Sequence, residues 1–147
     1  MTQLSKHFTL AELTHTDHRE LDNTPNESEL ANLQRLAAFL EQVKVALGGK
    51  PVMVNSAFRS KAVNDAVGSK DTSQHRVGCA ADIRVPGMAP DAVCRALIDA
   101  QLPYDQLIRE FDAWTHLSIP NHSNHPPRRQ TLIIDKTGVR PFTPAPP

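Results

Sequence analysis

The stretch SQHRVGCAAD, residues 73–82, places an imidazole (His75) and a carboxylate (Asp82) seven positions apart, with a glycine and small residues between them. If the chain turns at Gly78 and enters a strand, Ala80 and Asp82 project from one face, because successive side chains of a strand alternate between its faces. Asp82 can then return toward His75, and the small residues let the backbone pass close to a bound ion. The segment therefore predicts two ligands of a metal site.

A third ligand has to come from elsewhere, because a catalytic zinc ion usually takes three protein ligands and keeps a fourth position for water. His116 is the natural candidate. It lies in the strand-like run WTHLSI, residues 114–119, where a structural role would favour an aliphatic or aromatic side chain. On residue types alone, ordinary core and surface histidines remain the alternative. We expect the other five to be solvated surface residues: His7, His15, His18, His122 and His125.

The amino-terminal part is predicted to be helical. Residues 8–13 have Thr9 as an N-cap and Glu12 three positions later, which is the pattern of a capping box. Residues 30–47 repeat apolar side chains at helical spacing, and the following Gly48-Gly49 pair predicts the end of that helix.

Strands and short helices alternate in the rest of the chain. Apolar or alternating runs predict strands at residues 51–55, 79–85 and 131–134, a β-hairpin at residues 106–110 and 114–119, and helices at residues 60–67 and 91–100. Beyond Gly138, prolines leave too few backbone donors for regular structure. We therefore expect one domain over residues 1–140 and an extended or disordered proline-rich tail over residues 141–147.

Composition excludes several classes of function. The 147 residues match one ordinary domain, and sixteen basic residues balance sixteen acidic ones, so no strong field draws the protein to nucleic acid or an anionic membrane. No apolar run reaches the roughly 18 residues of a membrane span or the roughly 7–15 of a signal-peptide core. We expect a monomer that is made in the cytoplasm without a signal peptide and has no nucleic-acid partner and no membrane insertion.

Three motifs resemble the D-alanyl-D-alanine carboxypeptidase family of zinc peptidases. Residues 73–82 follow its signature Ser-x-His-x-x-Gly-x-Ala-x-Asp. Residues 56–60, SAFRS, resemble its Ser-Gly-Tyr-Arg-Ser element, and residues 114–116, WTH, resemble its Trp-x-His element in the expected order. Residues 8–13, 23–25 and 105–108 also resemble the branch of this family that is common in phages and bacterial prophages.

By this resemblance, His75, Asp82 and His116 hold a Zn²⁺ ion, with a water on the metal as the nucleophile. The implied fold is α+β, with helices packed on a small antiparallel sheet, as in hedgehog-type domains. The implied substrate is the peptide of bacterial peptidoglycan, cut by a D,D-carboxypeptidase or endopeptidase, or at the L-alanyl-D-glutamate bond. Family habit places the enzyme at the cell wall after release or in a virion, as in phage endolysins.

The general base departs from the family pattern. Better-known members carry a carboxylate three residues before the last histidine, and Ala113 occupies that position here. Two acids remain nearby, Glu110 at the end of one predicted hairpin strand and Asp112 in the turn. We favour Glu110, because a strand-end side chain can project onto the face of His116, whereas an aspartate in a turn more often stabilises the turn. Asp112 is the alternative base.

Three more residues are candidates for contact with the substrate. Arg59 could bind a substrate carboxylate or stabilise the oxyanion. Ser73 and Gln74 could hydrogen-bond to the substrate or to the metal ligands. Ala57 and Phe58 replace the glycine and tyrosine of the family element beside Arg59, which affects substrate contacts and leaves the metal ligands unchanged.

Two other functions compete with a peptidase. A zinc-containing wall-binding module or phage tail component without catalytic activity is the main alternative, and the missing acid at Ala113 favours it. A cysteine hydrolase that pairs Cys79 with His75 is weaker, because strand alternation directs Cys79 away from the face of Asp82. We expect Cys79 and Cys94 to be small buried hydrophobic residues.

Overall fold

The longest helix, α2 (Glu27–Ala46), forms the base of the molecule in the computed structural model, which describes residues 2–143. Asn26 caps it in a capping box with Glu29, and the chain leaves it through Gly48 and Gly49, both with positive φ. The short helix α1 (Leu10–Leu13) has the predicted box between Thr9 and Glu12. Among residues 2–143, no helix has the length and apolar character needed to cross a membrane.

A six-stranded sheet has the order β1-β2-β4-β3-β5-β6. Its strands are β1 (Met53–Ser56), β2 (Ala80–Arg84), β3 (Gln106–Glu110), β4 (Trp114–Ser118), β5 (Gln130–Asp135) and β6 (Gly138–Pro141). Strands β3 and β4 form the predicted antiparallel hairpin. The fold is α+β, as expected, but the sheet is mixed, because β5 lies parallel to β3 after a long connection around the end of the sheet.

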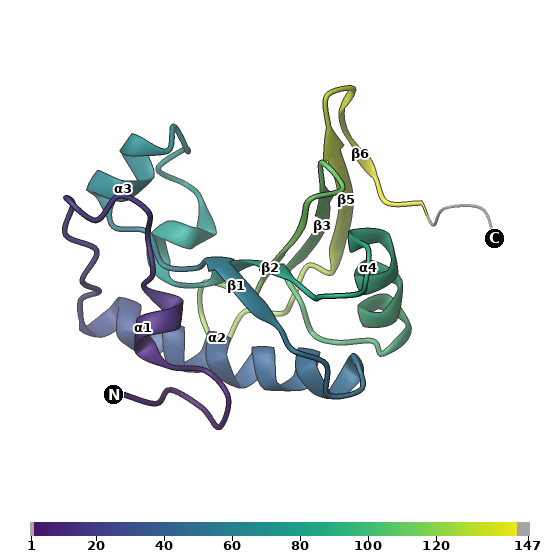
Figure 1. Ribbon diagram of the computed structural model, residues 1–147, viewed down its shortest axis with the longest axis horizontal. Helices are drawn as coiled ribbons and strands as arrows, with labels where there is room; N and C mark the ends of the chain where they lie inside the picture. Colours follow the sequence, from purple (N-terminus) through teal and green to yellow (C-terminus); the bar gives the residue numbers. More distant parts are fainter. Residues whose placement is uncertain (1, 144–147) are drawn as a thin grey trace.

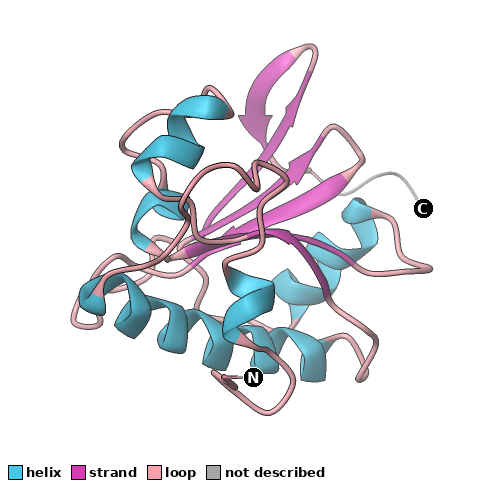
Figure 2. Cartoon of the chain, turned by 60° about the vertical axis from the view of Figure 1, so that its left-hand side comes forward, coloured by secondary structure: helices cyan, strands magenta, loops and turns pink. Residues whose placement is uncertain are grey.

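The helices lie on different sides of the sheet (Figures 1 and 2). Helix α2 runs below β1 and β2 in Figure 1, and α4 (Pro90–Asp99) packs against β3 and β4. Helix α3 (Lys61–Ala66) lies above β1 and β2. The core fills the space between α2, α4 and one face of the sheet, where apolar side chains are almost completely buried: Leu33, Leu36, Leu40, Ile83, Leu97, Leu107 and Leu117. The other sheet face carries polar side chains such as Asp82 and His116 together with apolar ones such as Ile108.

The end of the chain corrects one prediction. Residues 138–141, expected to be irregular, form β6, which pairs antiparallel with β5 at the edge of the sheet. Pro141 is tolerated because an edge strand has a neighbour on one side only. The amide of Phe142 then donates to Thr131 O at 3.0 Å, so the pairing continues past the proline. The part of the predicted tail at residues 144–147 lies outside the described residues.

Candidate metal centre

Strand pairing places two of the predicted ligands opposite each other. Asp82 of β2 is the cross-strand partner of His116 of β4, so both side chains lie on the face of the sheet away from the core. His75 comes from the 3₁₀-helix η1 (Gln74–Val77), which precedes β2. All three side chains are buried, with exposed fractions of 3% for His75, 8% for Asp82 and 9% for His116.

The three side chains converge on one point. Asp82 Oδ1 lies 3.3 Å from His75 Nε2 and 2.9 Å from His116 Nδ1, and one ligand atom from each residue lies within 4.8 Å of the others. In a tetrahedral zinc site with ligand distances of about 2.0–2.1 Å, neighbouring ligand atoms are roughly 3.3–3.4 Å apart. The spacing of these donors therefore fits a zinc ion with small side-chain shifts.

The protonation states also suit a metal. Burial, which outweighs the attraction of Asp82, lowers the pKa of His75. Burial disfavours the charged form of Asp82, but the hydrogen bond from His116 holds its pKa below the ordinary value. A neutral imidazole beside an ionised carboxylate is the state that metal ligation requires. The ring nitrogen His75 Nδ1 donates to the carbonyl of Ala57 at 2.7 Å, which leaves Nε2 free to bind.

The 3₁₀-helix that carries His75 is fixed against α2. Arg76 forms an ion pair with Glu29 at 2.6 Å, and Asn32 donates to the carbonyl of Val77 at 2.8 Å. Gly78 ends η1 with φ 83°, and a Cβ atom there would lie 2.9 Å from Glu29 O. Only glycine satisfies both the left-handed backbone and this close approach, so the glycine of the motif sets how close η1 lies to α2.

Arg59 lies directly beside the cluster. Its Nη2 is 3.3 Å from Asp82 Oδ2, its Nε donates to Ser56 Oγ at 3.1 Å, and its backbone amide donates to His75 O at 3.0 Å. Asn23 holds the same loop, because its amide group bonds to Phe58 O at 3.0 Å and accepts from Ser60 N at 2.7 Å. The guanidinium thus stands between a metal-ligand carboxylate and the open side of the site.

Ser73 and Gln74 hydrogen-bond to groups around η1. Ser73 Oγ accepts from the amide of His75 at 3.3 Å and so caps η1. The amide nitrogen of Gln74 has two N–H groups, which three acceptors share: Asp105 Oδ2 at 3.1 Å, Ile119 O at 2.9 Å and Asn121 Oδ1 at 3.0 Å. Gln74 therefore connects η1 to the ends of β3 and β4. Both side chains support the segment of His75, and the donor of Gln74 is already in use.

The two candidate bases lie in different surroundings. Glu110 is the cross-strand partner of Trp114 and shares the sheet face of His116. Asp112 has φ 50° in the hairpin turn and forms an ion pair with Arg109, which projects from the opposite face of β3. The Asp112 carboxylate is therefore engaged in the hairpin turn, which is the structural role that its position in sequence favoured.

Electrostatics at Glu110 reflect its position beside the cluster. Burial and the charge of Asp82 raise its pKa, whereas His116, Arg59 and the Trp114 side chain act in the opposite direction. The net shift is upward, so this carboxyl group binds a proton more readily than an exposed glutamate. A raised pKa is typical of carboxylates that act as general bases.

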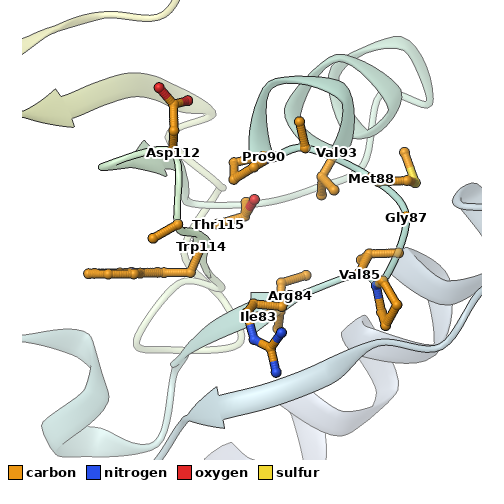
Figure 3. Close-up of a pocket in the computed structure, with 13 residues that line it drawn as sticks. Ile83, Arg84, Val85, Gly87, Met88, Pro90, Val93, Asp112, Trp114 and Thr115 are labelled. Carbon is orange, nitrogen blue, oxygen red and sulfur yellow. The ribbon is translucent and has the colours of Figure 1, made fainter.

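A pocket of about 340 Å³ opens where β2 and β4 diverge beyond Ile83 and Thr115 (Figure 3). The connection from β2 to α4, the start of α4 and the hairpin turn line it. Figure 3 shows Val93 and Met88 on one side and the ring of Trp114 extending away from them. None of the three ligands and no atom of Glu110 lines this pocket, so it is a neighbour of the metal cluster and not its enclosure.

The remaining histidines and the cysteines do not join the cluster. The other five histidines are exposed or partly exposed, and three of them face carboxylates: His7 with Glu41, His15 with Asp17 and His18 with Glu20. Cys79 is completely buried, and burial raises the pKa of its thiol to about 11. A thiol that stays protonated is a poor nucleophile, which argues against a cysteine hydrolase.

Two imidazoles and one carboxylate, from η1, β2 and β4, form a donor set that could hold a metal ion, and a further carboxylate lies on the same sheet face. A family model described as Peptidase M15 matches residues 6–118, and the chain belongs to this family of zinc-dependent peptidases. The match contains the three ligands, Arg59 and Glu110, and it ends before β5 and β6. No curated protein matches the chain significantly.

Sequence patterns did not single out two residues that shape the site. The Trp-x-His motif gave Trp114 no role of its own, although strand alternation places its side chain on the same face as that of His116. Asn23 holds the Arg59 loop through contacts 35 and 37 residues away in sequence, and no local pattern signals such contacts.

Proposed function

We propose that the protein hydrolyses peptide bonds in peptidoglycan stem peptides or cross-links, with zinc held by His75, Asp82 and His116. The observation that carries the proposal is the convergence of these three buried donors, with Glu110 on the same sheet face. Membership of a zinc peptidase family supports the class of reaction. The bond is one beside a D-alanine or the L-alanyl-D-glutamate bond, and the setting is that of a phage lysin.

His75 Nε2, Asp82 Oδ1 and His116 Nδ1 would supply the metal ligands. A zinc ion held there supplies Lewis acidity, which lowers the pKa of a water molecule from 15.7 toward roughly 7 and polarises a carbonyl. Ala57 O keeps the His75 ring in the tautomer that leaves Nε2 unprotonated. Arg59 keeps one oxygen of Asp82 engaged, so that the other faces the two imidazoles.

Glu110 is the general base of the proposal. Its carboxylate accepts a proton from the attacking water and then gives that proton to the leaving amine, a role worth about 10²–10⁴-fold in rate. The position supports this, because a diagonal neighbour on adjacent strands lies roughly 7–8 Å away, and a side chain from Glu110 can cover that gap toward His116. Arg59 is placed to bind a substrate carboxylate or the oxyanion with the donors that do not face Asp82 and Ser56.

One observation favours a second function. Ala113 replaces the acid expected three residues before the last histidine, and a domain that keeps its metal but lacks a competent base would bind the cell wall without cleaving it. Such a module would carry zinc and release no peptide amines.

The test is release of new amino groups from purified peptidoglycan by the wild type, Glu110→Gln and Asp112→Asn, with zinc measured in each sample. We expect one zinc in all three proteins, release by the wild type and Asp112→Asn, and at least a roughly 100-fold loss in Glu110→Gln. Equal zinc with no release by any of them supports the binding module. Release by Glu110→Gln at the wild-type rate contradicts the role of Glu110.

A further inference from the structure

Trp114 carries a buried hydrogen-bond donor that the metal cluster does not use. Its indole Nε1 is inaccessible to solvent and has no hydrogen-bond partner among residues 2–143. Leaving such a group unmatched costs about 1–3 kcal/mol, so a buried orphan donor needs a physical explanation. Trp114 lies two positions before His116 in β4, and its ring therefore lies on the face of the metal ligands.

Glu110 supplies an acceptor of suitable chemistry on the neighbouring strand. Its Cα is the cross-strand partner of that of Trp114, and such pairs have Cβ atoms roughly 4.5–5.5 Å apart. The indole already lowers the pKa of Glu110, although the two groups do not form a hydrogen bond of normal geometry. On another side, the ring of Phe111 lies 5.9 Å from the indole, between centroids, and has no acceptor atom.

We infer that the indole N–H of Trp114 donates to the Glu110 carboxylate and positions it for proton transfer. The inference rests on the proposed role of Glu110 as the base. Indole nitrogen is a donor only, so it can hold one carboxylate oxygen without competing for the proton that the other oxygen accepts. A histidine or tyrosine in its place could exchange protons with the base. Trp114 is thus a positioning residue that acts through Glu110.

The chain has a single tryptophan, which makes a clean test possible. Expression with β-(3-benzothienyl)alanine in place of tryptophan changes only residue 114 and replaces the N–H with sulfur in a ring of nearly the same shape. We expect unchanged zinc content and KM, with kcat lower by roughly 10-fold to 100-fold, the size of one hydrogen bond to a charged group. A merely structural role predicts no change in kcat, and that result overturns the inference.

A second measurement does not depend on catalysis. The ¹H–¹⁵N spectrum contains one indole signal, and we expect its proton to lie further downfield in the wild type than in Glu110→Gln, because a carboxylate is a stronger acceptor than an amide. Asp112→Asn removes a nearby charge that faces Arg109 and should leave the signal in place. The inference is overturned, even if the protein is active, if the chemical shift of the indole proton is unchanged in Glu110→Gln or changes equally in Asp112→Asn. A signal that moves as expected in a protein without turnover upholds the hydrogen bond and contradicts the proposed function instead.

Discussion

The segment that carries His75 is tied to three other parts of the molecule, whereas the side chain of Glu110 makes no hydrogen bond of normal geometry within residues 2–143. Around His75, Arg76 bonds to α2, Gln74 bonds to the ends of β3 and β4, and the backbone carbonyl accepts from Arg59. Glu110 takes its direction from the sheet and, by the inference above, from the single donor of Trp114. Metal ligands need fixed positions, but a base has to accept a proton in one direction and deliver it in another. The difference predicts that zinc binding and turnover can be lost separately.

Gly78→Ala should have the largest effect on stability, because it disturbs the contact between η1 and α2. An alanine at this position would have to adopt φ 83°, and its Cβ atom would lie 2.9 Å from Glu29 O. We expect a loss of about 2–5 kcal/mol in the free energy of unfolding, from backbone strain and overpacking together, measured by urea denaturation. Gly68→Ala is the matched control, since its φ of 74° is similar but the space around it is open. An equal loss in both variants would show that the close approach to α2 does not matter.

Asp105→Asn tests the far end of the Gln74 contact. Asp105 is buried, and although burial opposes its ionisation, hydrogen bonds from Arg128 hold its pKa below the ordinary 3.8. Its contribution is therefore present above pH 3.8 and is lost as the pH falls through the lower folded-state value. We expect the variant to be less stable by about 1–3 kcal/mol at pH 7. The gap should close in acid. A gap that is the same at pH 7 and in acid contradicts this account.

Gln74→Ala distinguishes support of His75 from contact with the substrate. Loss of the three hydrogen bonds should loosen η1 and weaken zinc binding by about 10-fold to 100-fold, the usual effect of removing an outer partner of a ligand. The check is competitive titration with a chelator. Gln106→Ala is the control, because Gln106 bonds to Gln130 on the exposed side of the sheet. A raised KM with unchanged zinc affinity would show that Gln74 contacts the substrate and does not support His75.

Asp112→Asn should have the smallest effect. The exposed ion pair with Arg109 contributes at most about 1 kcal/mol, and kcat should not change. Thermal denaturation and steady-state kinetics check the two expectations. A large fall in kcat would identify Asp112, and not Glu110, as the base. The comparison of the His75 segment with Glu110 would then no longer explain how zinc binding and turnover separate.

Local signals in the sequence predicted much of the fold. The capping box at Thr9, the helical repeat before Gly48 and the hairpin around residues 111–113 each depend on neighbours within a few residues, and the structure contains all three. The parallel pairing of β5 with β3 could not be predicted in this way, because it joins segments about 24 residues apart. Strand β6 was missed for a different reason. It pairs with the adjacent strand β5 and is held by the ion pair of Arg140 with Asp135, but its proline-bearing segment has no strand pattern of its own.

In the candidate site, too, local sequence signals predicted some residues, whereas contacts with distant partners could not be predicted. His75, Asp82 and His116 were predicted from motif spacing and the family resemblance. The cross-strand register places Asp82 opposite His116, and η1 adds His75. For Gln74 the sequence predicted a contact with the substrate or with the metal ligands. Its observed partners Asp105 and Asn121 lie 31 and 47 residues away, and nothing near it in sequence indicates them.

The most direct test of the central claim is the zinc content of the purified protein, measured by mass spectrometry after dialysis, for the wild type and for His75→Ala, Asp82→Ala and His116→Ala. His122→Ala serves as a control, because His122 is exposed and its ring packs edge-on against that of His125. The account predicts one zinc per chain in the wild type and in the control, and little or no zinc retained after dialysis by each of the other three variants. Full zinc occupancy in all three ligand variants would contradict it.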